Sequence, residues 1–178
     1  MQNRKLLNIE LGRVSADQYK DLPESGIVVV LDNVRSAHNV GSAFRTADSF
    51  KIDKVWLCGI CAVPPSAEIH KSALGAEDSV AWEHVDDTMD AIRTLKEQGY
   101  IIVSAEQTVG SVMLDTFVPA PDQKYAVVFG NEVAGVSQDV VDASDFALEI
   151  PQYGTKHSLN VSVSMGVVLW HFRLHKNQ

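Results

Sequence analysis

Three short polar clusters carry the side chains of this sequence that are best suited to chemistry. Asn39 and Arg45 belong to the first cluster, Glu132 ends the second, and Ser158 and Asn160 form the third. Amide, hydroxyl and carboxylate groups can orient a polar substrate, and a guanidinium can hold a phosphate through two parallel hydrogen bonds. Taken singly, each cluster also has a structural explanation as a solvated arginine, a turn or a helix N-cap.

Two further patterns could bind a metal or carry out redox chemistry. Cys58 and Cys61 have the Cys-x-x-Cys spacing, but a Pro-Pro pair follows, so no helix begins at Cys61 to lower its thiol pKa. No second cysteine pair completes a zinc site. His171 and His175 are one helical turn apart and lack a third ligand with suitable spacing. We therefore expect buried thiols, solvated histidines and no metal site.

The polar clusters follow the ends of apolar runs, which alternate with helical periodicity along the chain. The runs predict strands at residues 26–32, 54–58, 80–85, 100–105, 125–129 and 146–150. Helices are predicted from residue 39 onward and at residues 86–98, 137–143 and 158–175. Strands alternating with helices predict an α/β fold with a mostly parallel sheet and helices on both faces.

The composition is that of a soluble globular protein, and it excludes disordered, collagen-like and low-complexity classes. The 178 residues include 46% hydrophobic and 21% charged side chains, which suits a single domain with a continuous core. No apolar run approaches the roughly 20 residues of a spanning helix, so no membrane segment is expected. Two cysteines and no export signal lead us to expect a cytoplasmic protein.

The charge balance bears on possible partners. The 15 basic and 23 acidic side chains give a net charge of −8. Such a chain is not expected to coat nucleic acid, because non-specific phosphate binding draws on clustered lysine and arginine. A local basic face is compatible with this charge, since affinity follows the local field.

Taken together and in order, the clusters resemble the three signature motifs of the SpoU-type (TrmH family) RNA ribose 2′-O-methyltransferases of the SPOUT superfamily. The first motif is Asn39-x-Gly41-x-x-x-Arg45, and the second is Phe129-Gly130-Asn131-Glu132-x-x-Gly135. The third is Ile150-Pro151 followed by Ser158-Leu159-Asn160-Val161-Ser162. Residues 70–77, with Trp82 beyond them, are also similar to a family segment. The resemblance covers the chain from about Ile27 to its C-terminus.

This resemblance implies a fold that pattern alone would not predict. The family fold is an α/β sheet with a C-terminal deep trefoil knot, although true knots are nearly absent from proteins. We expect one domain over residues 1–178, with residues 1–25 as a short N-terminal extension. Family members are homodimers, and Trp170 and Phe172 on the last helix are candidates for such an interface.

The resemblance also implies an activity. S-adenosylmethionine is expected to bind backbone groups at Gly130, Ile150 and Leu159, with Thr108 as a further candidate. Its methyl group would pass to a ribose 2′-hydroxyl. Arg45 is the implied proton acceptor, and four residues would orient it and the substrate: Asn39, Glu132, Ser158 and Asn160. Deprotonating a free arginine near pH 7 costs about 7 kcal/mol, so we keep open that Arg45 mainly grips a phosphate.

The expected partner is structured RNA. Arg35, Lys71 and Lys156 lie in or near the motif loops and are candidate RNA-binding residues, and the extension adds Arg4, Lys5 and Arg13. The compact form and the segment at residues 70–82 favour tRNA over rRNA. Two alternative functions are kept open: that of a non-catalytic RNA-binding relative, and that of a thiol redox protein that uses Cys58 and Cys61.

Overall fold

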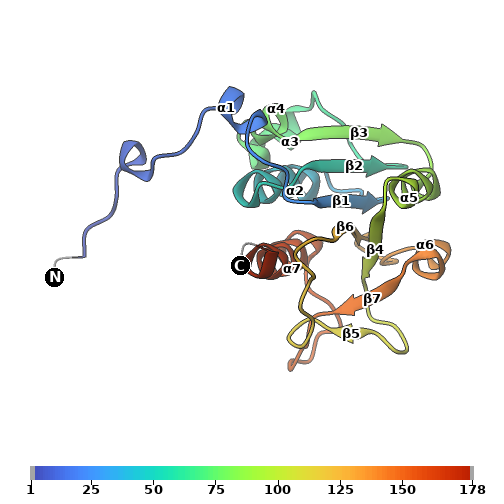
Figure 1. The fold of residues 1–178 in the computed structure, drawn as a ribbon. Coiled ribbons are helices and arrows are strands. Elements are labelled where there is room, and N and C mark those ends of the chain that lie inside the picture. The colour runs from blue at the N-terminus through green and yellow to red at the C-terminus, as the bar shows by residue number, and fades with distance from the viewer. Residues whose placement is uncertain (1–2, 177–178) are drawn as a thin grey trace.

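Seven strands form one sheet in the computed structural model, which describes residues 3–176 (Figure 1). Neighbouring strands all run parallel. Their order across the sheet is β3 (Ala81–Val85), β2 (Lys54–Cys58), β1 (Ile27–Asp32), β6 (Lys124–Phe129), β4 (Tyr100–Ala105), β7 (Phe146–Glu149) and β5 (Val112–Met113). β1 is buried at all six positions, as expected of a central parallel strand that reads as a continuous apolar run.

Helices cover both faces of the sheet. One face packs against α1 (Ala16–Lys20), α2 (Ala37–Phe50), α3 (Ala67–Ala73), α4 (Ala76–Ser79) and α7 (Val161–Lys176). The other face packs against α5 (Thr88–Glu97) and α6 (Gln138–Ala143). Side chains alternate along β1, so Val29 and Leu31 enter the first core while Val28 and Val30 enter the second. The predicted α/β fold with a mostly parallel sheet is confirmed, and the trefoil knot stays a prediction.

The last helix begins later than predicted. The sequence pattern favours a start near Ser158, but α7 begins at Val161. The Asn160 Oδ1 atom accepts hydrogen bonds from the Ser162 amide at 2.9 Å and the Ser162 hydroxyl at 2.6 Å. Asn160 is therefore the residue that caps the helix, because it satisfies an amide of the first turn that has no partner within the helix. The three residues before α7, Ser158 to Asn160, lie outside the helix.

The first motif helix is held tightly against its neighbour. A Cβ atom added to Gly41 would lie 2.2 Å from Ser72 Oγ and 2.3 Å from the Ile69 carbonyl oxygen. The Ser72 hydroxyl donates a hydrogen bond to the His38 carbonyl at 2.9 Å. α2 and α3 can approach this closely only because residue 41 has no side chain. Neither α3 nor α4 was predicted from the periodicity of the sequence, and both are short.

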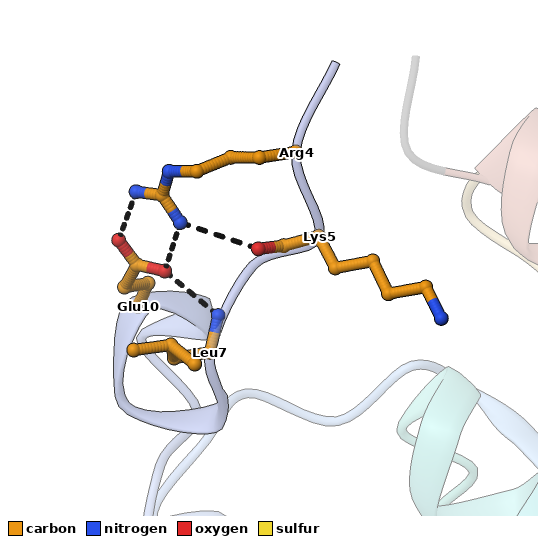
Figure 2. A network of polar contacts seen from close by, with 4 residues as sticks. All are labelled: Arg4, Lys5, Leu7 and Glu10. Carbon is orange, nitrogen blue, oxygen red and sulfur yellow. Dashed lines mark hydrogen bonds and ion pairs between the residues drawn. The ribbon is translucent and has the colours of Figure 1, made fainter. Parts of the chain in front are cut away.

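The N-terminal segment extends away from the body of the molecule (Figure 1). It holds a short 3₁₀ helix, η1 (Asn8–Leu11), before α1. Figure 2 shows the Arg4 guanidinium donating to both carboxylate oxygens of Glu10, at 2.6 and 2.8 Å. The bond from Arg4 and then one from the Leu7 amide lower the pKa of Glu10 to about 2. Tyr19 anchors the following α1, with its hydroxyl 3.4 Å from the Ala47 carbonyl.

Among residues 3–176, no helix combines the length and the apolar character needed to cross a bilayer.

Candidate functional site

A cavity of about 500 Å³ opens where the carboxyl ends of β4, β6 and β7 meet. Its walls are residues 105–107, 129–135, 148–150 and 157–161, together with Gln152 and Ser164. Ligands of open α/β sheets bind beyond the carboxyl ends of the strands, at the place where the strand order changes direction. The second and third polar clusters of the sequence therefore meet at the edge where such a site is expected.

Glu132 ties the second motif to the first. Its Oε1 atom accepts hydrogen bonds from the Ser36 amide at 2.9 Å and the Asn39 side chain at 2.9 Å, and its Oε2 atom accepts one from the Arg35 amide at 3.0 Å. Partial burial raises the pKa of Glu132, but the Arg35, Asn39 and Ser36 hydrogen bonds outweigh it and leave the pKa below its ordinary value. The carboxylate is thus kept ionised as an acceptor.

Asn39 links this contact to the third motif. It lies in the first turn of α2 and is only 7% exposed. Its Oδ1 atom lies 3.4 Å from the Asn160 Nδ2 atom, which donates to it. A single path of polar contacts therefore runs from Asn160 through Asn39 to Glu132. It joins three segments that are far apart in the sequence.

The loop after β6 exposes backbone to the cavity because it carries a glycine, Gly130, where the loop folds back on itself at Gly135. A Cβ atom on Gly130 would lie 2.0 Å from the Gly135 carbonyl carbon. Asn131 and Gly135 exchange two backbone hydrogen bonds, both 2.9 Å long. Gly135 has φ 70°, a conformation that favours glycine. The closed loop leaves no room for a side chain at residue 130, so its main chain borders the cavity.

Of the four residues expected to bind a cofactor, three line the cavity and one does not. Gly130, Ile150 and Leu159 all line the cavity. Thr108 stands outside the lining, in a turn where its carbonyl accepts a hydrogen bond from Ser111. The last residue of β4, Ala105, and the two residues that follow it, Glu106 and Gln107, line the cavity instead.

Of the five residues expected to act in catalysis, three line the cavity and two do not. Glu132, Ser158 and Asn160 line the cavity, and Asn39 contacts Glu132. Arg45 lies on the exposed surface of α2, outside the lining. Its guanidinium has no hydrogen-bond or ion-pair partner among residues 3–176.

The candidate RNA-binding cations lie on the surface. Arg35 and Lys156 are exposed, and Arg35 follows β1 in the loop that Glu132 holds. Lys71 is exposed on α3 and forms an ion pair with Glu68 at 2.5 Å. The cavity itself is lined by the carboxylates of Glu106, Glu132 and Glu149 and by no lysine or arginine.

Sequence reasoning missed two buried or half-buried carboxylates that shape this edge. Asp32 ends β1 and is 1% exposed, and it accepts hydrogen bonds from Ser137 at 2.8 and 2.7 Å and from Thr88 at 2.6 Å. Glu106 accepts from the Val136 amide at 3.0 Å and lines the cavity. An acidic residue that directly follows an apolar strand is the signal that could have indicated them.

The cysteine pair does not have the environment of a redox site. Cys58 and Cys61 are free and buried. Burial raises the pKa of the Cys61 thiol to about 11 and raises that of Cys58 further. Redox-active thiols have lowered pKa values and solvent access, so these contacts argue against the thiol redox alternative.

The histidine pair of the last helix is used in packing. His171 Nε2 lies 2.6 Å from the Phe117 carbonyl oxygen, and the rings of His171 and His175 are 4.6 Å apart. Within the described residues, no three His, Cys, Asp or Glu side chains are grouped to hold a metal ion.

The chain is similar to a family of RNA-modifying proteins. The SpoU rRNA Methylase family matches it over residues 26–170. A 23S rRNA (guanosine-2′-O-)-methyltransferase, RlmB, of Nitrosomonas europaea is 36% identical over 167 residues, which are 91% of this chain and 62% of the relative. The protein of that name from Neisseria meningitidis is 31% identical over 153 residues, 86% of this chain and 60% of the relative. The chain spans about three fifths of the length of these relatives.

Solved structures agree with the fold. The AdoMet-bound rRNA methyltransferase of Sinorhizobium meliloti gives a TM-score of 0.78 at 28% identity, covering 88% of this chain and 60% of that one. The TrmH/SpoU tRNA modifying enzyme of A. aeolicus gives 0.79 at 25% identity, covering 91% and 82%. The family match spans the sheet and all three motif segments that the polar contacts join at the cavity, and the chain therefore belongs to the SpoU rRNA Methylase family.

Proposed function

We propose that this chain transfers a methyl group from S-adenosylmethionine to a ribose 2′-hydroxyl of structured RNA. The observation that carries the proposal is the polar path from Asn160 through Asn39 to Glu132, at the rim of the cavity. It assembles three motif segments at one place. The relatives named above as RNA methyltransferases support the same reaction class.

The cavity suits the cofactor on its own geometry. An adenosyl group needs an apolar slot with hydrogen-bonding backbone at its edge. Ile150 and Leu159 supply apolar walls, and Gly130 supplies main chain that no Cβ atom can cover. When bound, S-adenosylmethionine supplies a methyl group on a sulfonium centre that needs no further activation.

The residues around the cavity would bind and orient the substrate. The Glu132 carboxylate already accepts three N–H donors, so we assign it to holding the Arg35–Ser36 loop and not to accepting a proton. Asn39 and Asn160 fix the relative position of α2 and α7. Ser158 remains a candidate to orient the ribose. Arg45 would accept the hydroxyl proton only after losing one of its own to become the neutral guanidine, whereas as the charged guanidinium it would grip the adjoining phosphate. Its side chain has no partner among residues 3–176 that would prevent either role.

The identity of the RNA needs a correction. We expected tRNA to be favoured over rRNA, but two of the relatives are named for 23S rRNA, and these names give that preference no support. We propose ribosomal RNA as the first substrate to test. We assign contacts with its phosphates to Arg35 and Lys156, which are exposed. Arg4 and Lys71 are also exposed but are already paired with carboxylates. Phosphate binding by arginine and lysine dominates RNA affinity.

We further propose that the protein acts as a homodimer through the outer face of α7. Val163, Val167, Trp170 and Leu174 are 51, 39, 56 and 47% exposed and recur along one stripe of this helix. The Trp170 ring lies 5.8 Å from the Phe50 ring, which extends the apolar surface onto α2. Phe172, the other residue expected at the interface, is wholly buried in the core and is unavailable to a partner. We place the activity in the cytoplasm, where unpaired thiols persist.

The test begins with cofactor affinity. We expect purified protein to bind S-adenosylhomocysteine at about one site per chain by calorimetry. Arg45→Ala should keep this affinity and lose methyl transfer to unmodified ribosomal RNA transcribed in vitro, with Arg45→Lys retaining less than a tenth of the activity because lysine lacks the bidentate fork. Binding of cofactor without any transfer by the wild type would favour the non-catalytic RNA-binding alternative. Normal turnover by Arg45→Ala would contradict both roles proposed for Arg45.

A further inference from the structure

A second hollow, of about 610 Å³, lies beside the edge strand β3 and shares no residue with the cavity described above. Its lining is Pro64, Pro65, Ser66, Ala67, His70, Glu77, Asp78 and Trp82. These residues come from the loop after β2, from α3 and α4, and from β3. Nothing in the proposed reaction uses them.

The hollow has a broad aromatic wall. Trp82 pairs with Val55 across the parallel ladder and remains 37% exposed, because β3 is the edge strand. Pro64 and Pro65 add rigid apolar surface that no side-chain rotation can remove. A flat ring fits such a wall, because stacking on tryptophan combines apolar burial with π-contact.

The two carboxylates of the hollow, those of Glu77 and Asp78, are hydrogen-bond acceptors. The Glu77 side chain is 9% exposed and already engaged, with Oε1 2.6 Å from His70 Nδ1 and Oε2 accepting from the Gly75 amide at 3.0 Å. The Asp78 carboxylate has no hydrogen-bond partner in the described part of the chain. Among the residues that the structure describes, no lysine or arginine lines the hollow. A phosphate would therefore be repelled here, while a group that donates hydrogen bonds would be attracted.

Among the RNA bases, guanine matches this combination. Its Watson–Crick edge presents two adjacent donors, N1–H and N2–H, which a single carboxylate can accept together. Adenine and cytosine place a donor beside an acceptor, and uracil places one donor between two acceptors. An acceptor carboxylate beside a stacking ring therefore selects guanine.

The hollow is also connected to the first motif through the packing of α3 against α2. α3, which carries His70, packs against α2 at Gly41, and the Ser72 hydroxyl holds the His38 carbonyl in the first turn of α2. We propose that this hollow binds an unstacked guanine of the substrate RNA, distinct from the nucleotide that is methylated, through Trp82 and Asp78. The inference rests on the proposed function for its ligand, since RNA is the source of the base.

The test uses a local signal. The Nε1–H resonance of Trp82 is identified in a ¹⁵N-labelled sample by its loss in Trp82→Phe, and the full chain is titrated with the hexaribonucleotides UUGUUU, UUIUUU and UUUUUU. We expect UUGUUU to shift the Trp82 resonance while those of Trp56 and Trp170 stay in place. Inosine lacks the N2 amino group, so UUIUUU should bind about tenfold more weakly. No Trp82 shift, or equal shifts by all three probes, would overturn the proposal.

Matched variants distinguish stacking of the base on Trp82 from recognition of its hydrogen-bonding edge by Asp78. Trp82→Ala should weaken binding of UUGUUU by about 5- to 100-fold. Asp78→Asn should keep stacking but bring the affinities for UUGUUU and UUIUUU within about twofold of each other, because the carboxylate that accepts both donors is gone. Glu83→Gln removes a carboxylate from the next residue of the same strand, outside the hollow, and should change neither affinity. Loss of guanine preference in Glu83→Gln would contradict the assignment to Asp78.

Failure of this inference can be told apart from failure of the proposed function. S-adenosylhomocysteine should bind Trp82→Ala as it binds the wild type, because the two sites share no residue. If cofactor binds and Trp82 does not respond to guanine, the hollow is wrongly assigned and the methyltransferase proposal stands. If guanine shifts Trp82 but no cofactor binds, the hollow binds a base and the proposed reaction is wrong.

Discussion

Glu132 stabilises the motif loops through its charge, and this makes its contribution dependent on pH. A lowered pKa gives stability that is full above the unfolded value of about 4.3 and is lost as the pH falls through the lower folded value. We expect Glu132→Gln to unfold at lower urea than the wild type at pH 7, with a deficit of about 0.5–1 kcal/mol after solvent screening. The deficit should shrink as the pH is lowered from 5 toward 3. A deficit that is independent of pH would show that charge is not the cause.

The cysteines allow a second test at the residue scale. With the pKa of Cys61 near 11 and that of Cys58 also raised by burial, few native thiols are ionised at pH 8. We expect iodoacetamide to label neither cysteine appreciably in the folded protein and to label both in urea, as followed by mass spectrometry. Rapid labelling of the native chain, or a disulfide after mild oxidation, would restore the redox alternative.

At the scale of the elements, Asn160, the residue before α7, makes two separate contacts through its side chain. Asn160 caps the helix through Oδ1 and reaches Asn39 through Nδ2. Asn160→Ala should cost about 1 kcal/mol of stability and most of the methyl transfer. Asn160→Asp keeps an acceptor for the cap but has no donor for Asn39, so we expect stability near that of the wild type with activity still reduced. Thermal unfolding and a transfer assay separate the two effects, and full activity in Asn160→Asp would contradict the role of the Asn39 contact.

The contact between α2 and α3 gives a prediction with an internal control. Gly41→Ala forces a Cβ atom to within 2.3 Å of two atoms of α3 and should destabilise the fold by about 1–3 kcal/mol. Gly166→Ala, within α7, meets no atom within 4 Å and should stabilise it by about 0.5–1 kcal/mol through helix propensity. Urea titrations of both variants check the signs. Equal effects would show that the close packing at Gly41 is unimportant.

For the whole molecule, the exposed stripe on α7 predicts the oligomeric state. Light scattering after gel filtration should give twice the 19.5 kDa mass of the chain. Val167→Glu places a charge in the centre of the stripe and should give a monomer, because an unpaired charge is costly to bury in an interface. Ile60→Glu, on an exposed loop away from α7, serves as the control and should stay dimeric. A wild-type monomer would remove the dimer from the proposal.

The sequence by itself determined six of the seven strands, the helices α2, α5, α6 and α7, and the motifs, whereas the short α1, α3, α4 and β5 were not predicted. A short, β-branched apolar run such as that of β1 indicates a buried strand, and the polar clusters at the strand ends include Gly130, Glu132 and Asn160, which line the cavity. Tertiary structure alone decided where those residues stand. Asn160, and not Ser158, caps α7 through the Ser162 amide, and Asn39 is buried because it contacts Glu132 and Asn160. The exposure of Arg45, by contrast, already followed from its place off the apolar stripe of its helix. The second hollow also depends on tertiary structure, since its residues become neighbours only when α3 and α4 pack beside the edge strand β3. Periodicity is local, whereas a site depends on which strand ends are brought side by side.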